Sequence, residues 1–167
     1  MRAPSVIVMP VEEVSVPEER KPVLIGRGGK TKEEIEKRTG TDISIGVYVK
    51  IEGSVDGLLK AQNIVSAIGR GFSPKHAFRL LDENCQLDVI TLREENDKTR
   101  RRLMARVIGR EGNSRKIIEK ETGTFISVYG KTVSIIGLPE ETELARKAVE
   151  ALLEGKKHGY AYSLIKE

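Results

Sequence analysis

The chain has 167 residues, of which 38% are hydrophobic and 32% are charged, and its formal net charge is +4. This balance is typical of a globular protein with many surface charges, and the mildly basic character permits an anionic partner. No apolar run is long enough to cross a bilayer and the N-terminus shows no signal-peptide pattern, so we expect a cytoplasmic protein with no membrane contact.

The first half of the chain predicts a strand, two helices around a glycine turn, two strands and a longer helix. Stretches of helix formers without interior glycine and alternating apolar residues give the boundaries. In chain order we expect a strand at 6–11, helices at 17–25 and 30–38, strands at 42–45 and 48–51, and a helix whose apolar positions run from Ala61 to Ile68.

The second half repeats this β-α-α-β-β-α order. We expect a strand at 87–92, helices at 97–108 and 113–121, strands at 125–128 and 132–136, and a helix that starts near Pro139 with apolar positions from Ala145 to Leu152. An internal repeat of this kind predicts two copies of one module. We therefore place the first domain at 1–82 and the second at 83–167.

Each module closes on a further short apolar segment. The residues of the first segment are matched in order by those of the second: Ala77, Phe78, Leu80 and Leu81 by Ala161, Tyr162, Leu164 and Ile165. We expect an extra helix in each module. Added packing for a small domain is the first interpretation, and docking of the two halves is the second.

A short glycine signature marks the turn between the first two helices of each module. It reads Ile-Gly-Arg-Gly-Gly at 25–29 and Ile-Gly-Arg-Glu-Gly at 108–112. Glycine tolerates unusual backbone angles and leaves room for a phosphodiester backbone, and the free N–H groups of the next helix attract phosphate. A Gly-x-x-Gly turn in this position is known to clamp single-stranded nucleic acid. Ile25 and Ile108 are expected to belong to the cores.

The candidate binding residues lie in the turns, in the helices beside them and in the first strand that follows. We expect the isoleucines to form the walls of a narrow apolar groove for unstacked bases. In the first module the candidates are Gly26, Arg27, Gly28, Gly29, Lys30, Lys32, Ile35 and Ile43. In the second they are Arg102, Arg106, Gly109, Arg110, Glu111, Gly112, Asn113, Arg115, Ile118 and Ile126.

Charge distinguishes the two modules. Residues 17–40 carry seven basic and five acidic side chains, whereas residues 97–120 carry nine basic and three acidic ones. Affinity for nucleic acid rises with the number of phosphates neutralised, so the second module is expected to bind more strongly. Arg102, Arg106 and Arg110 share one helix face that leads to the turn, and we expect Arg106 and Arg110 to contact phosphate. Glu111 opposes this because it would repel phosphate.

Nothing in the sequence indicates catalysis, a metal site or a cofactor. His76 and His158 lie in or near the extra helices and do not cluster, and no carboxylate-rich metal site is visible. The single cysteine, Cys85, excludes an internal disulfide and is expected to be a buried small side chain. We therefore expect a protein that is not an enzyme.

The paired turns, with the elements around them, resemble the KH domain of the eukaryotic type (type I). The chain as a whole resembles the archaeal relatives of the Dim-two (partner-of-Nob) and Krr ribosome-assembly factors. The resemblance implies an α+β fold with two tandem modules, each a three-stranded antiparallel sheet with helices on one face. It also implies binding to single-stranded RNA near the 3′ end of small-subunit rRNA. The implied partners are the endonuclease that trims that end and the alpha subunit of translation initiation factor two.

Two other functions stay open from the sequence. The chain could be a general binder of RNA or single-stranded DNA, or a scaffold whose first module docks a protein. In eukaryotic members of the family the first turn is degenerate, whereas residues 26–29 keep an intact glycine turn here.

Overall fold

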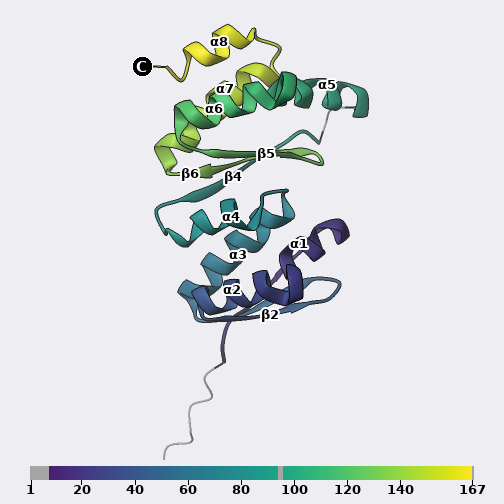
Figure 1. Cartoon of the computed structure of the whole chain (residues 1–167), viewed down its shortest axis with the longest axis vertical. Coiled ribbons are helices and arrows are strands. Elements are labelled where there is room, and N and C mark those ends of the chain that lie inside the picture. Colours follow the sequence, from purple (N-terminus) through teal and green to yellow (C-terminus); the bar gives the residue numbers. More distant parts are fainter. Residues whose placement is uncertain (1–7, 94–95, 167) are drawn as a thin grey trace, which may run out of the picture.

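The computed structural model describes residues 8–93 and 96–166. Two units of the same plan are stacked along the long axis, so that sheets and helical layers alternate (Figure 1). From one end the order is the first sheet, its helices, the second sheet and its helices, with α8 outermost. The second sheet therefore lies between two helical layers, whereas the first sheet is covered on one face.

The first unit consists of a three-stranded antiparallel sheet, in the order β1-β3-β2, and helices packed on one of its faces. Ser54 begins the longest helix by accepting a hydrogen bond from the N–H of Gly57, as N-cap residues do. The elements are β1 (Val11–Val14), η1 (Glu18–Arg20), α1 (Lys21–Ile25), η2 (Arg27–Gly29), α2 (Lys30–Thr39), β2 (Thr41–Ile45), β3 (Val49–Gly53), α3 (Val55–Gly69), α4 (Pro74–Ala77) and η3 (Phe78–Leu81).

The second unit has the same topology, with its strands in the order β4-β6-β5. Pro139 occupies the first position of its longest helix, where the missing N–H has no cost. The elements are β4 (Gln86–Thr91), α5 (Asp97–Ile108), η4 (Arg110–Gly112), α6 (Asn113–Thr122), β5 (Phe125–Tyr129), β6 (Thr132–Gly137), α7 (Pro139–Leu153) and α8 (His158–Ser163). The predicted α+β fold with two β-α-α-β-β-α modules is confirmed.

The first strand is the one element that the sequence misplaced. A strand was expected at 6–11, but β1 runs from Val11 to Val14, and the first two of the expected residues lie outside the described part of the chain. Val14 pairs with Val49 and, like Val16 just after the strand, is buried in the core. Burial of these two valines, which a β-rich run alone does not reveal, fixes the register.

The two sheets differ in the face that points away from their own helices. Cross-strand neighbours Asp42 and Glu52 are exposed on the first sheet. At the corresponding pair of the second sheet stand Phe125 and Ile136, and Ile136 is fully buried in the core of the first unit. Burying this apolar face removes it from water, which favours docking of the second sheet onto the first unit's helices.

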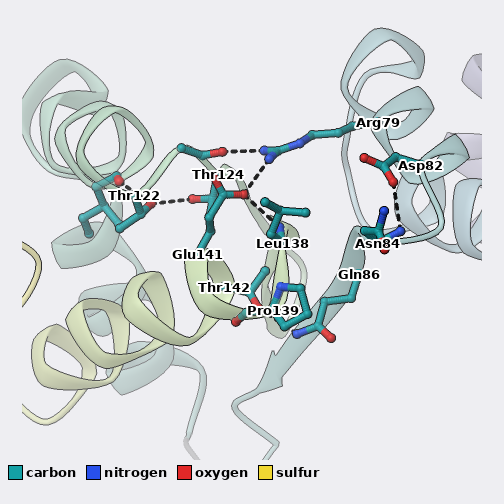
Figure 2. Close-up of polar contacts among 12 residues, drawn as sticks. Arg79, Asp82, Asn84, Gln86, Thr122, Thr124, Leu138, Pro139, Glu141 and Thr142 are labelled. Atoms are coloured by element: carbon teal, nitrogen blue, oxygen red, sulfur yellow. Dashed lines mark hydrogen bonds and ion pairs between the residues drawn. The ribbon is translucent and has the colours of Figure 1, made fainter.

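Polar contacts at the edge of this face fix the docking (Figure 2). Arg79 donates hydrogen bonds to the carbonyl oxygen of Gly123 and, at 2.6 Å, to the carboxylate of Glu141. Glu141 in turn accepts a bond from the N–H of Leu138 at 2.8 Å, at the start of α7. A single arginine thus connects the first unit to two elements of the second.

The extra segments serve both expected purposes. In the first unit Ala77 and Leu80 complete the core, while the ring of His76 stacks on Phe125 of the second unit with centroids 3.9 Å apart. In the second unit α8 packs on the helices of its own module, with Ala161 fully buried. Docking of the halves was the second choice from the sequence, and it applies to the first segment alone.

The single cysteine of the chain lies in the core of the first unit. Cys85 is buried next to β4, and desolvation raises the pKa of its thiol above the ordinary value. The expectation of a buried small side chain is confirmed. None of the helices in the two described ranges has the length and apolar character that spanning a bilayer requires.

Candidate nucleic-acid interface

The two glycine turns have the same backbone conformation. The first glycines, Gly26 and Gly109, have φ of 76° and 74° with ψ of 175° in both. The last glycines, Gly29 and Gly112, have φ of 77° and 76° with ψ of 10° in both. A short 3-10 turn links them, and α2 and α6 begin at the next residue. The second copy therefore preserves the turn although one of its glycines is replaced.

The first and last glycines of each turn have different roles. A Cβ added to Gly26 would lie 2.7 Å from the Cβ of Thr31, and one added to Gly109 would lie 2.6 Å from the Cβ of Ser114. These two glycines are packed against their own helices. A Cβ at Gly29 would meet nothing within 4 Å, so the later part of the turn faces open space. This is the surface that a phosphate backbone could approach.

Glu111 is the one residue other than glycine that has a positive φ in the described ranges, at 55°. Gly28 takes the same place in the first turn, with φ of 61°. The left-handed region costs an L-residue roughly 1–2 kcal/mol, so the second turn is more strained than the first. Glu111 is exposed and brings a negative charge to the open side of the turn.

Several of the expected polar residues lie exposed around the turns. Arg27 and Lys30 are exposed at the first turn, as are Arg110 and Asn113 at the second. Lys30 and Asn113 are the first residues of α2 and α6, where unsatisfied backbone N–H groups and the helix dipole favour anions. Arg102 is also exposed, and it lines an open pocket of about 490 Å³ together with Arg106 and Arg110.

Arg106 is half-exposed, and its guanidinium is already bound within the protein. Its guanidinium donates to the carbonyl oxygens of Leu152, at 3.0 Å, and Lys156, at the C-terminal end of α7. In the first unit Arg20 binds the matching acceptors, Ile68 and Phe72, both at 2.8 Å. Each arginine satisfies carbonyls that a helix end leaves open, so Arg106 is structural in this state.

Lys32 and Arg115 also bind a neighbour within the module. Each pairs with a glutamate one turn later, Lys32 with Glu36 and Arg115 with Glu119, at 3.0 Å in both cases. The same glutamates accept a bond at 2.9 Å from a backbone N–H of the adjacent strand, that of residue 43 or residue 126. The sequence analysis missed both glutamates, although their matching positions in the two copies were a usable signal.

The predicted groove walls are buried more deeply than expected. Ile35 and Ile118 are fully buried, and Ile43 and Ile126 are each 3% exposed, so these four residues belong mainly to the cores. Ile126 reaches the floor of a pocket in the second unit.

Ile25 and Ile108, which were expected in the cores, are instead 38% and 37% exposed. Each lies at the end of the helix that leads into its turn, and Ile108 lines the pocket whose floor Ile126 reaches. The isoleucines expected to line grooves thus lie in the cores, whereas the two expected in the cores are partly exposed at helix ends.

The second unit has more exposed cations than the first. In residues 17–40 several of the cations have polar partners inside the protein: Arg20, Lys21, Lys32 and Arg38. The exposed cations there are Arg27, Lys30, Lys37 and Arg38. In residues 97–120 the exposed ones are Lys98, Arg101, Arg102, Arg110, Lys116 and Lys120.

Within the described residues, no group of His, Cys, Asp and Glu could hold a metal ion.

Sequence comparisons match both units to KH domains. The family described as eukaryotic type KH-domain (KH-domain type I) matches residues 85–167, and the family described as KH domain matches residues 11–67. The KH domain-containing protein MJ0443 of Methanocaldococcus jannaschii is 41% identical over 164 residues, which cover 93% of this chain and 72% of that protein. The pre-rRNA-processing protein PNO1 of Chaetomium thermophilum is 28% identical over 122 residues, which cover 68% of this chain and 46% of that protein.

A solved structure agrees with these relatives over nearly the whole chain. The a/eIF2alpha–aDim2p–rRNA complex from Pyrococcus horikoshii OT3 contains a chain that is 45% identical, with a TM-score of 0.88 and coverage of 94% of this chain and 92% of that one. The resemblance that the glycine turns indicated is confirmed. The chain belongs to the Dim2/PNO1 family of proteins with two tandem KH domains of type I.

Proposed function

We propose that this protein binds single-stranded RNA during small-subunit rRNA processing, near the 3′ end of that RNA, and that the turn at 109–112 is its main clamp. The observation that carries the proposal is the open side of two turns with the same backbone conformation, at the start of α2 and α6. Backbone N–H groups and exposed arginines meet there with no side chain in the way at Gly29, and the nearest atom to a Cβ at Gly112 is 3.9 Å away.

The second unit is the stronger candidate because its exposed cations are more numerous and lie along the helices beside the turn. Each phosphate neutralised adds to affinity through release of counterions. The first unit, with four exposed cations in the matching stretch, extends the RNA track or shares its surface with a protein. We place the boundary between the two domains at residues 82 and 83, in the short connection from η3 to β4.

The relatives support this choice of RNA and suggest partners. PNO1 of C. thermophilum is described as a pre-rRNA-processing protein, and the P. horikoshii relative was crystallised with rRNA and a/eIF2alpha. We infer that the present chain also acts on rRNA in the cytoplasm, without catalysis of its own or a cofactor. Its proposed partners are the alpha subunit of initiation factor two and the endonuclease that trims the rRNA 3′ end.

Titration with a fluorescent oligonucleotide from the 3′ end of small-subunit rRNA tests the proposal. Gly109→Asp is a poor test because its side chain would collide with α6, so the variant of choice is Arg110→Asp with Gly112→Asp. We expect this pair to weaken binding at least tenfold, because it removes one cation and places two negative charges in the turn beside the phosphate. Unchanged binding would show that RNA does not use this turn.

Competition with unrelated strands tests the choice of RNA. An unrelated single-stranded RNA or DNA of equal length should compete at least tenfold less well than the rRNA strand. Equal competition would favour a general binder of single strands over a factor that acts on rRNA.

A further inference from the structure

The groove of the second unit has a wall that comes from the first unit. A pocket of about 350 Å³ lies beside the end of α5. One side is formed by Ile108, Arg115 and residues 126–128 of β5. The other is formed by residues 71–73, from the connection between α3 and α4, and by His76 of α4. The two sides come from different modules. Its volume lies within the range of sites for small ligands.

The wall from the first unit is held firmly against β5. Gly71 has φ of 97°, and a Cβ there would lie 2.9 Å from the Cβ of Tyr129. The hydroxyl of Ser127 donates to the carbonyl oxygen of Arg70 at 2.8 Å. The ring of His76 lies parallel to that of Phe125, with an angle of 4° between the planes. Contacts on both sides of the pocket thus fix its width before any ligand binds.

The chemistry of the pocket suits one nucleotide of a single strand. Ile108 is 37% exposed and offers an apolar surface to a base, directly before the turn that faces phosphates. Arg115 provides a cation on the same side. On the opposite wall Ser73 is exposed, and its oxygen already accepts a bond from the N–H of His76 at 3.3 Å. Its hydroxyl hydrogen is therefore available to a base or ribose.

We propose that residues 71–76 of the first unit form part of the RNA site of the second unit, so that one nucleotide is held between the two modules. This inference rests on the proposed function, because it assumes that RNA binds at the second turn. A preformed wall lowers the cost of ordering the site and makes recognition depend on the docking of the modules. Ser73 and His76 are then residues that contact RNA from outside the module that holds the clamp.

The test compares two variants of Ser73 that both keep its role at the start of α4. Aspartate and asparagine are both good N-cap residues, so S73D and S73N differ mainly by one negative charge. We expect S73D to bind a short single-stranded rRNA strand about fivefold more weakly than S73N, because the carboxylate would lie close to the RNA backbone. Equal melting temperatures of the two variants verify that the fold is kept.

Ser54 provides a matched control. It is also an exposed serine at the start of a helix, but α3 is 15 residues long and separates it from the groove by about 20 Å. S54D and S54N should bind RNA equally within about twofold, because salt screens charges at that distance. A similar loss in S54D would mean that a general charge effect explains S73D, which would overturn the inference.

A crosslinking experiment with 4-thiouridine in the RNA provides a second measurement. We expect crosslinks in a peptide that contains residues 71–76 of the wild-type chain, in addition to crosslinks near the second turn. If S73D equals S73N, or if crosslinks occur in the second unit alone, the shared site is wrong while the proposed function stands. If the wild-type chain binds no RNA, the proposed function and this inference both fall.

Discussion

The strained glutamate of the second turn makes a prediction about both stability and binding. Glu111 has φ of 55°, whereas Gly28 takes the same conformation freely in the first turn. Replacing Glu111 by glycine removes a strain of roughly 1–2 kcal/mol, and the greater freedom of glycine in the unfolded chain offsets about 0.5–1 kcal/mol of it. We therefore expect Glu111→Gly to raise the free energy of unfolding by about 0.5–1 kcal/mol.

The same substitution removes a negative charge that faces the proposed phosphate path. One charge at a distance of about 7 Å in water contributes about 0.6 kcal/mol, so affinity for single-stranded RNA should rise roughly threefold. Glu111→Gln separates the two effects, because it removes the charge and keeps the strain. It should bind RNA like Glu111→Gly and unfold like the wild type.

Gly28→Gln is the reverse substitution at the matching position of the first turn, where it introduces the strain without a charge. A Cβ at Gly28 has nothing within 4 Å, so strain alone should lower the free energy of unfolding, by about 1 kcal/mol. Urea unfolding followed by circular dichroism measures all three variants, and the changes correspond to about 2–4 °C in Tm for each kcal/mol. If Glu111→Gly is no more stable than Glu111→Gln, the account of strain in the second turn is wrong.

Three further predictions follow from packing and titration. Gly109→Ala should lower the free energy of unfolding by roughly 2–4 kcal/mol because of collision and strain. Gly112→Ala, whose Cβ would make only ordinary contacts at 3.9 Å or more, should cost about 1 kcal/mol in the same urea assay. Equal losses would contradict the separate roles of the two glycines. Ile136→Glu introduces the residue that the first sheet has at the matching position, Glu52. It should lower the free energy of unfolding by roughly 3–5 kcal/mol, or separate the units and so increase the radius of gyration in X-ray scattering. An unchanged radius and stability would contradict the docking. Burial and a hydrogen bond to the carboxylate of Glu19 raise the pKa of Tyr129. The contribution of Tyr129 to stability is therefore present below about pH 10 and is lost as pH rises through the higher pKa of the folded state. Tyr129→Phe should lose less stability than the wild type at alkaline pH, and identical losses would contradict this.

The order of the elements could be predicted because it depends on local signals that occur twice. The glycines of the turns and the apolar stripes of the long helices have the same spacing in both halves, so each copy supports the interpretation of the other. Gly40 and Gly123 follow the matching helices directly and end them in the left-handed conformation that glycine favours. These features need no knowledge of distant contacts.

The features that the sequence did not predict depend on contacts between distant segments. Arg106 looked like a phosphate ligand, but its acceptors are carbonyls 46 and 50 residues away. The docking of the units had a readable signal, since apolar Phe125 and Ile136 replace charged Asp42 and Glu52 at matching strand positions. The apolar residues alone do not predict docking, because burial of the second face of a sheet depends on which surface covers it.

The central claim is that the second turn, more than the first, holds the RNA. Matched double variants test it: Arg110→Asp with Gly112→Asp in the second turn, and Arg27→Asp with Gly29→Asp in the first. Each pair makes the same changes at equivalent positions, so fluorescence anisotropy with one rRNA strand compares the turns directly. We predict that affinity falls at least fivefold further for the second-turn pair than for the first-turn pair. An equal loss, or a greater loss for the first turn, would contradict the account.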